Sequence, residues 1–266
     1  MARNSIVVIL FAFLSACSLK PKTELHPEFK TYFDEFEVEG CFLLYDFQKD
    51  KTTIYNPDRC EQGFLPASTF KMVNTLIGLD NGIITGEDFI IPWDSVHRQI
   101  PAWNREHNLP SAFKNSVVPW YQELARKTEL EKMQKGLEKA QFGKMDVLDK
   151  NLDLFWLTGN SRITPLEQLD FQKRLVKNEL QFKQEDINLL KKIMILKESS
   201  EFILRGKTGW AIMDATNIGW LVGYIETKNN TYAYVLNVES DADDTTLFSK
   251  SRTGITEKII AHLGLM

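Results

Sequence analysis

The segment Pro66–Lys71, with the sequence P-A-S-T-F-K, places a hydroxyl three residues before an amine at the start of an apolar helix. Residues i and i+3 lie on one helical face, so this spacing predicts that the Ser68 hydroxyl and the Lys71 amine converge. Pro66 favours a helix entry and Asn81-Gly82 a helix end. In the first turn, free backbone N–H groups and the helix dipole favour the anion that an attacked carbonyl becomes. The alternative is a serine that only caps the helix and a lysine that only faces solvent.

Two further polar motifs follow along the chain. Ser116-Val117-Val118 comes after a polar stretch, and Lys207-Thr208-Gly209 lies in the strand-like run Phe202–Met213. An S-x-x-K motif with a later K-T-G is the signature of serine enzymes that recognise penicillin, and class A members carry S-D-N between the two. This chain carries S-V-V instead. Together with S-T-F-K, that middle motif resembles the class D (oxacillinase-type) serine β-lactamases, whose middle motif is S-x-V.

Other positions agree with this resemblance, which extends from about Gly40 to the C-terminus. Trp156, in the run F-W-L, matches a tryptophan of the family, and Arg252 matches an arginine close to the last helix. Phe142-Gly143-Lys144 stands where the family usually has Y-G-N. This departure removes a phenol hydroxyl and adds a charge, and we expect it to alter rates rather than to abolish activity.

The Ser68 hydroxyl is a poor nucleophile until a base removes its proton, and the nearest candidate base is Lys71. An apolar pocket disfavours the ammonium form and lowers the pKa of a lysine. The resemblance implies that the neutral Lys71 amine captures CO₂ as a carbamate (N6-carboxylysine), an oxygen base for both acylation and hydrolysis of the acyl-enzyme. It also implies that the Trp156 indole hydrogen-bonds this carbamate, although a buried tryptophan more often only packs. The expected apolar lining is Phe70, Val118, Trp156 and Leu157.

The remaining site roles are also implied by the resemblance. Ser116 would pass the proton to the leaving nitrogen, and the backbone N–H groups of Ser68 and Trp210 would form an oxyanion hole. Lys207, Thr208 and Arg252 would bind the substrate carboxylate. Taken alone, Arg252 is better explained as a solvated charge beside a helix, and it counts only as part of this set. The other expected substrate-binding residues are Val118, Trp103 and Gly209, the last because it permits close backbone approach.

Length and composition are those of a compact enzyme. With 266 residues, 43% hydrophobic, the chain can bury the core of one catalytic domain or of two merged subdomains. The net charge of −4 does not suggest a nucleic-acid partner. The resemblance implies that the partner is a small-molecule β-lactam. No metal is expected, and no cofactor other than CO₂ or bicarbonate. The histidines that fall in no metal-ligand spacing are His26, His97, His107 and His262.

The first sixteen residues predict an export signal. Arg3 precedes the apolar run Ile6–Leu14, which at nine residues is too short to span a bilayer. The following Leu14-Ser15-Ala16-Cys17 resembles a bacterial lipobox, which implies cleavage before Cys17 and lipidation of its thiol. The mature enzyme, 17–266, is then expected to be held on a membrane facing the periplasm. The alternative is an ordinary cleaved signal and a soluble periplasmic protein.

Strand patterns at both ends of the chain enclose a mostly helical middle. Phe42–Asp46 and Thr52–Tyr55 predict a hairpin, and three later strands are predicted at 202–213, 217–227 and 231–239, before a last helix at 246–265. The predicted fold class is therefore α/β. An antiparallel sheet from about 30–67 and 200–266 is flanked by helices, a helical subdomain of about 68–199 is inserted, and the site lies in the crevice between them. The resemblance implies the same serine β-lactamase and penicillin-recognising transpeptidase-like fold.

Two cysteines, Cys41 and Cys60, flank the predicted hairpin. Export would place them in an oxidising compartment, and the ends of a hairpin are close, so a disulfide is one alternative. Two small buried thiols are the other.

Two other functions remain open at this point. A β-lactam sensor domain would be acylated and stay acylated, but known sensors are attached to several transmembrane helices and none is predicted here. A penicillin-binding transpeptidase or carboxypeptidase would more often carry S-x-N in place of S-V-V.

Overall fold

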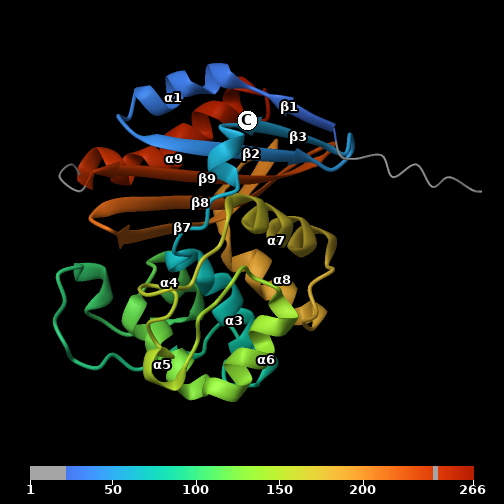
Figure 1. The fold of residues 1–266 in the computed structure, drawn as a ribbon. Coiled ribbons are helices and arrows are strands. Elements are labelled where there is room, and N and C mark those ends of the chain that lie inside the picture. The colour runs from blue at the N-terminus through green and yellow to red at the C-terminus, as the bar shows by residue number, and fades with distance from the viewer. Residues whose placement is uncertain (1–21, 242–244) are drawn as a thin grey trace, which may run out of the picture.

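The computed structural model describes residues 22–241 and 245–266. A twisted sheet forms one layer of the molecule, with α1 (Lys30–Asp34) and α9 (Thr245–His262) on one face and most of the other helices on the opposite side (Figure 1). The expected signal segment and Cys17 lie outside the described residues, so the lipobox stays a prediction. None of the helices within the described ranges is long and apolar enough to cross a membrane.

The sheet has seven strands in the described part of the chain, in the order β1-β3-β2-β9-β8-β7-β6. Neighbouring strands are antiparallel except β1, which runs parallel to β3 with Lys22 beside Lys51. The predicted sheet is therefore antiparallel apart from its first strand. The strands are β1 (Lys22–Leu25), β2 (Glu39–Asp46), β3 (Lys51–Tyr55), β6 (Ile195–Glu198), β7 (Phe202–Met213), β8 (Thr216–Thr227) and β9 (Thr231–Asp241).

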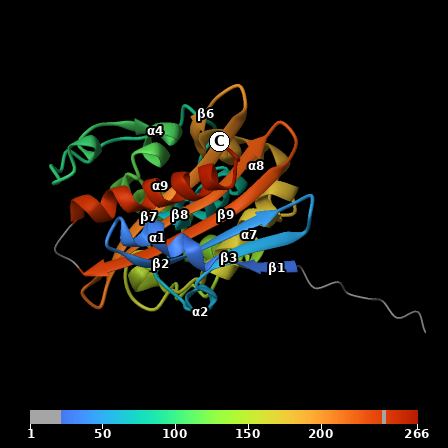
Figure 2. The same cartoon turned by 90° about the horizontal axis from the view of Figure 1, so that it is seen from above.

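The central strands are buried on both faces because each face is covered by helices. In β2, Phe42 and Leu44 pack with α1 and α9, whereas Leu43 packs on the other side, toward the helices that follow Ser68 in the sequence. Figure 2 shows α9 and α1 lying across the sheet as seen from above. Such strands read as continuous apolar runs rather than alternating ones.

The helical part lies on the side of the sheet opposite α1 and α9 (Figure 1). Most of its helices follow the segment that carries Ser68. A short ladder, β4 (Ile90–Ile91) with β5 (His107–Asn108), closes a fifteen-residue excursion between them. The helices are α2 (Pro57–Cys60), α3 (Lys71–Asp80), α4 (Leu109–Lys114), α5 (Val118–Thr128), α6 (Leu130–Ala140), α7 (Pro165–Lys177) and α8 (Gln184–Ile193).

The sequence predicted the long strands and the last helix well, and the short edge elements poorly. The run 202–213 is β7 without change, and the hairpin becomes β2 and β3. The predicted mostly helical middle also contains the short strands β4, β5 and β6, and neither these nor β1 were predicted. Strands β1 and β6 are exposed at every position, so no apolar alternation marks them.

Cys41 and Cys60 are both free and fully buried. A hydrogen bond between the two thiols, together with burial, raises the pKa of Cys60. The structure therefore has the second of the two alternatives, a pair of small buried thiols in contact.

Candidate active site

Ser68 lies in a 3₁₀ turn, η2 (Ala67–Phe70), and α3 starts directly after it. The sequence predicts Ser68 in the first turn of the α-helix, whereas the structure has it in the 3₁₀ turn directly before that helix. In a 3₁₀ turn residues i and i+3 eclipse each other, which aligns Ser68 with Lys71 more closely than an α-turn would. The predicted convergence is confirmed, because Lys71 Nζ lies 2.8 Å from Ser68 Oγ.

The backbone before Ser68 is strained and held in place. Ala67 has a φ of +50°, a left-handed value that a residue with a side chain rarely adopts. Its N–H donates to the carbonyl of Trp156 at 2.9 Å, which fixes the turn against the segment that carries this tryptophan. Ser68 is 8% exposed, so it keeps a small contact with solvent, whereas Lys71 has none.

Lys71 is fully buried. The pKa of Lys71 is held well below its ordinary value, mainly because the side chain is buried and secondly because the positive charge of Lys207 is nearby. Apart from Ser68, its Nζ lies 5.2 Å from the centre of the Tyr121 ring. No carboxylate is paired with Lys71 among the described residues, and burial of the side chain favours the neutral amine over the ammonium.

Trp156 is fully buried and stacks on Phe70, with ring centroids 5.3 Å apart. Its indole Nε1 is buried and has no hydrogen-bond partner among the described residues. A buried donor without a partner is costly, and native structures contain few of them. The Trp156 indole N–H is therefore a free donor beside the turn that carries Ser68.

Ser116, in the helical part, and Lys207, on the sheet, are joined by a hydrogen bond. Ser116 lies between α4 and α5 with a φ of +50°, and Lys207, on β7, donates to its Oγ. Lys207 Nζ also donates to the carbonyl of Thr208 at 3.1 Å. Burial, followed by the charge of Arg252, lowers the pKa of Lys207 to about 7. The helical part and the sheet are thus linked by a hydrogen bond between two predicted site residues.

Strand β7 runs directly alongside the Ser68 turn, and Gly209 allows this. A Cβ atom on Gly209 would lie 3.2 Å from Thr69 and 3.0 Å from Trp220. Arg252 reaches over from α9, donates to the Gly209 carbonyl at 3.1 Å and lies over the Trp210 ring at 5.2 Å. Burial lowers the pKa of Arg252 to about 10. Lys207, Thr208 and Arg252 therefore lie close together around Gly209, and their role in binding a carboxylate stays a prediction.

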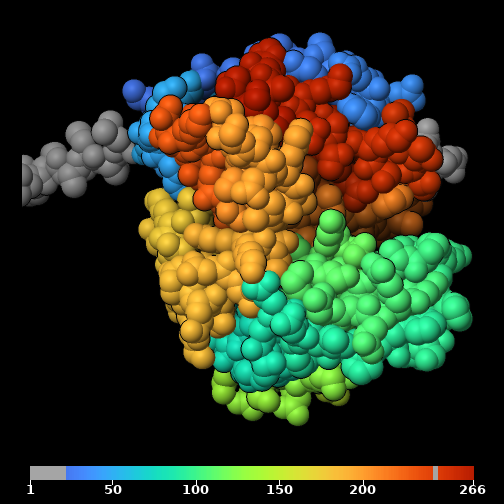
Figure 3. All heavy atoms as spheres, turned by 180° about the vertical axis from the view of Figure 1, so that it is seen from behind, coloured from blue at the N-terminus to red at the C-terminus, as the bar shows by residue number. Residues whose placement is uncertain are grey.

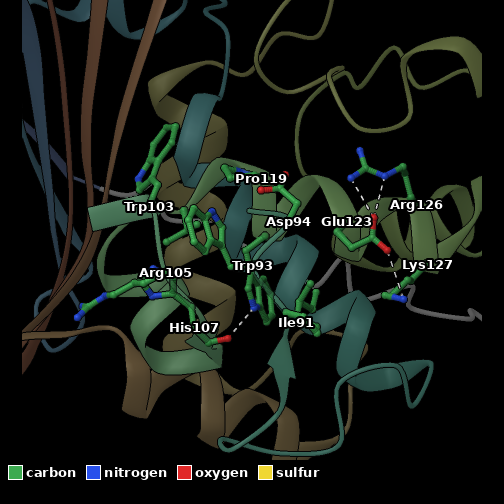
Figure 4. A pocket seen from close by; sticks show the side chains of 13 residues that line it. Ile91, Trp93, Asp94, Trp103, Arg105, His107, Pro119, Glu123, Arg126 and Lys127 are labelled. Atoms are coloured by element: carbon green, nitrogen blue, oxygen red, sulfur yellow. Dashed lines mark hydrogen bonds and ion pairs between the residues drawn. The ribbon is translucent and has the colours of Figure 1, made fainter. Parts of the chain in front are cut away.

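Trp103 lies on the other side of Ser116, in the excursion between β4 and β5. Its indole donates to the carbonyl of Asn115, the residue before Ser116, at 3.0 Å. Figure 4 shows Trp103 with Trp93 around a cavity of about 180 Å³ beneath the excursion. Val117 also borders this cavity, and Val118 starts α5 in a half-buried position beside it.

A second cavity, of about 220 Å³, borders Lys207 and Thr208 between α4 and β6. Figure 3 shows this region from behind, with the segment around α4 (green) beside the one that includes β6 (orange). One cavity is lined by Val117, the residue after Ser116, and the other by Lys207, so a cavity lies close to each partner of the contact between Ser116 and Lys207.

Phe142-Gly143-Lys144 supports the site from behind. Phe142 is buried and packs edge-on against Phe171 at 5.0 Å and near Phe70 at 6.2 Å. Gly143 has a φ of +60°, and a Cβ there would lie 2.7 Å from the Arg162 carbonyl. Lys144 joins Arg162 through two backbone hydrogen bonds of 2.8 Å. Phe142 therefore fills an apolar gap that has no need of a hydroxyl.

Sequence reasoning missed Tyr121 as a wall of the lysine pocket. Its ring faces Lys71, and its hydroxyl is 3.0 Å from Thr75 Oγ1, which fixes α5 against α3. A buried tyrosine in an amphipathic helix carries no local signal of this position, because the contact depends on how α3 and α5 pack.

Comparisons with known proteins agree with this geometry. The penicillin-binding protein transpeptidase domain matches residues 40–261. The probable β-lactamase YbxI of Bacillus subtilis is 39% identical over 234 residues, which cover 88% of this chain and 84% of that protein. A crystal structure of the class D β-lactamase YbXI from Nostoc superposes with a TM-score of 0.86 at 38% identity, covering 91% of this chain and all of that one. The C-terminal domain of the Bacillus licheniformis BlaR penicillin receptor superposes with a TM-score of 0.85 at 31% identity, covering 92% and 98%. The chain therefore belongs to the penicillin-binding transpeptidase domain family and, within it, to the class D β-lactamases.

Proposed function

We propose that this protein hydrolyses the amide bond of penicillin-type β-lactams through an acyl-enzyme on Ser68. The observation that carries the proposal is the 2.8 Å contact between Ser68 Oγ and the fully buried amine of Lys71. A neutral amine in that position can accept the hydroxyl proton, which a protonated lysine cannot. The backbone N–H groups of Ser68 and Trp210 are the proposed donors to the oxyanion, since β7 runs alongside the Ser68 turn.

We infer that Lys71 carries a carbamate formed from CO₂ in the active enzyme. Two observations support this: the lowered pKa of Lys71 supplies a neutral amine, and the buried Trp156 Nε1 lacks an acceptor. A carbamate supplies an oxygen base that serves Ser68 first and then the water that attacks the ester. Trp156 holds that oxygen with its indole N–H, and Tyr121 with Phe70 excludes bulk water.

The other residues bind substrate or move protons in this proposal. Ser116 passes a proton to the leaving nitrogen, helped by its hydrogen bond from Lys207. Lys207, Thr208 and Arg252 bind the substrate carboxylate, a group that suits a planar guanidinium. Gly209 permits the close backbone approach of β7 to the Ser68 turn, and Val118 and Trp103 form the wall on the helical side.

The direct experiment is turnover of a chromogenic cephalosporin by the purified mature chain in buffer with bicarbonate. Repeated turnover at substoichiometric enzyme supports hydrolysis. A single equivalent of product per protein molecule would instead support a β-lactam receptor, an alternative favoured by the similarity to the BlaR domain. Peptide release or transfer from peptidoglycan stem peptides would support the other alternative, a transpeptidase or carboxypeptidase.

Replacing Trp156 by phenylalanine is expected to make activity depend on bicarbonate. Phenylalanine keeps most of the bulk that stacks on Phe70 but removes the indole donor, and a charge-assisted bond is worth about 1.5–3 kcal/mol. Activity should be low in air and partly restored by high bicarbonate. The matched control is Trp120→Phe, because Trp120 is also buried but already donates to the His107 carbonyl at 3.0 Å. Bicarbonate-independent activity in Trp156→Phe would leave Trp156 as a packing residue only.

We also propose that the enzyme is exported and held on a membrane facing the periplasm by lipid on Cys17. The lipobox-like sequence 14–17 is the observation behind this proposal. Cys17→Ala is expected to abolish lipid attachment while leaving the activity of any mature enzyme unchanged, since the substitution lies outside the catalytic residues. Fractionation and intact mass check this. A parent chain without acyl mass would support the alternative of an ordinary cleaved signal.

A further inference from the structure

We propose that the β1 edge of the sheet is a membrane-contact surface, seated on phospholipid headgroups, and that the active site lies away from the bilayer. The proposal rests on the lipidation of Cys17 proposed above and adds an orientation to it. It does not depend on which reaction Ser68 carries out.

The length of the tether is the first argument. Cys17 and Lys22, the first residue of β1, are separated by the four residues 18–21. At 3.3–3.6 Å per residue, the five steps from Cys17 Cα to Lys22 Cα span at most about 18 Å. A lipid on Cys17 has its acyl chains in the bilayer, so the start of β1 has to stay close to the headgroup layer.

The β1 edge has the surface that this position requires. All four residues of β1 are exposed, and Figure 2 shows β1 at the rim of the sheet, beyond β3. Leu25 is 63% exposed, and Lys22 and Lys49 lie exposed at the same end of the strands, where Lys22 N donates to the Asp50 carbonyl at 3.3 Å. Lysines and an exposed leucine suit contact with phosphate headgroups and the interface below them.

Acidic residues share this edge, so charge alone does not provide the attraction. Glu24 pairs with Lys51, and Glu28 lies beside His26. The acyl anchor therefore supplies the binding energy, and the edge supplies the orientation. Binding to vesicles is accordingly expected to withstand high salt.

The register of the sheet fixes where the active site lies relative to this edge. Leu25 is in one cross-strand row with Lys207, five strand positions away, through Ile54, Leu43, Val235 and Val222. Neighbouring strands are about 4.8 Å apart, so the row measures about 24 Å. Ile212 lies five residues further along β7, about 17 Å from Lys207 along the strand. The site and the β7–β8 turn therefore lie well away from the tethered edge.

Two variants, each with one added cysteine at a position of almost equal exposure, test the orientation. Leu25→Cys and Ile212→Cys replace side chains that are 63% and 64% exposed, and the native Cys41 and Cys60 are fully buried. The full-length lipidated protein is placed in phosphatidylethanolamine–phosphatidylglycerol vesicles and labelled with a thiol-reactive fluorophore. A share of the lipids carries a nitroxide on the headgroup. The fluorophore at residue 25 is expected to be quenched severalfold more than that at residue 212, and the unsubstituted protein should take up no label.

Equal quenching at the two positions, or stronger quenching at residue 212, would overturn the proposal. A parent chain without acyl mass would also overturn it, because no tether would then exist. Inserting ten Gly and Ser residues after residue 21 should lower quenching at residue 25 without changing the acyl mass. Cephalosporin turnover in the same vesicles is measured separately, so failure of the enzymatic proposal is distinguishable from failure of the orientation.

Discussion

Lys71→Ala is expected to abolish β-lactam turnover, the largest loss that we predict from a single substitution. The variant removes the only basic group in contact with Ser68 Oγ among the described residues. Removing a catalytic base of this kind costs orders of magnitude in rate. The measurement is kcat/KM for a chromogenic cephalosporin with and without bicarbonate. A matched control is Lys191→Ala, because burial also lowers the pKa of Lys191 but its amine only contacts the Val176 carbonyl and Asn178.

The parent enzyme should show the pH dependence that follows from the Lys71 pKa. Because burial lowers this pKa, the amine stays neutral to a lower pH than an exposed lysine does, and it takes up a proton as the pH falls through the lowered value. CO₂ adds only to the neutral form, so activity is lost on the acid side. It should return after neutralisation faster with bicarbonate than without. Normal turnover by Lys71→Ala, with no bicarbonate response in the parent, would contradict the carbamate proposal.

A penicillin pulse followed by mass spectrometry is expected to show an adduct on Ser68 that appears and then disappears. A hydrolase and a receptor both acylate the serine, and they differ in whether water is activated against the ester. Ser68→Ala should show no adduct at any time, whereas Lys71→Ala should acylate slowly if at all and keep any adduct formed. Ser161→Ala is the control, since the Ser161 hydroxyl is buried elsewhere and accepts from Asp146 N at 3.0 Å.

An adduct that persists for hours in the parent, with stoichiometric loss of penicillin, would contradict the hydrolase proposal. The chain would then be a β-lactam receptor on the same fold. The outcome depends on deacylation alone, because the contact between Ser68 and Lys71 is compatible with either protein.

The parts of the site that sequence reasoning predicted are those encoded by short-range geometry. The three-residue spacing of Ser68 and Lys71 needs only a helical turn to bring the two atoms together. The contact of Ser116 with Lys207 could be predicted only from the order of motifs, because their sequence separation gives no local signal. The lining by Tyr121 could not be predicted, since it follows from how α5 packs on α3.

The long strands were predicted and the edge strands were not, for a physical reason. Strands β7, β8 and β9 are long apolar runs separated by turn residues, which is a strong local pattern. Strands β1 and β6 have only four residues each, and each is hydrogen-bonded to one neighbouring strand, β3 and β7 respectively. Their existence depends on the finished sheet, so no window of sequence around them indicates it.

The excursion between β4 and β5 carries Trp103, a residue of the proposed substrate wall, but neither Ser68 nor Lys71. Residues 92–106 begin and end at one short ladder, where Ile91 pairs with His107, and Trp103 is tied to the Ser116 turn through the Asn115 carbonyl. None of the residues proposed above to acylate or to move protons lies on this segment. Changes in its length or composition are therefore compatible with unchanged positions of Ser68 and Lys71. Natural variation in the excursion would then be one route to the acceptance of new antibiotics.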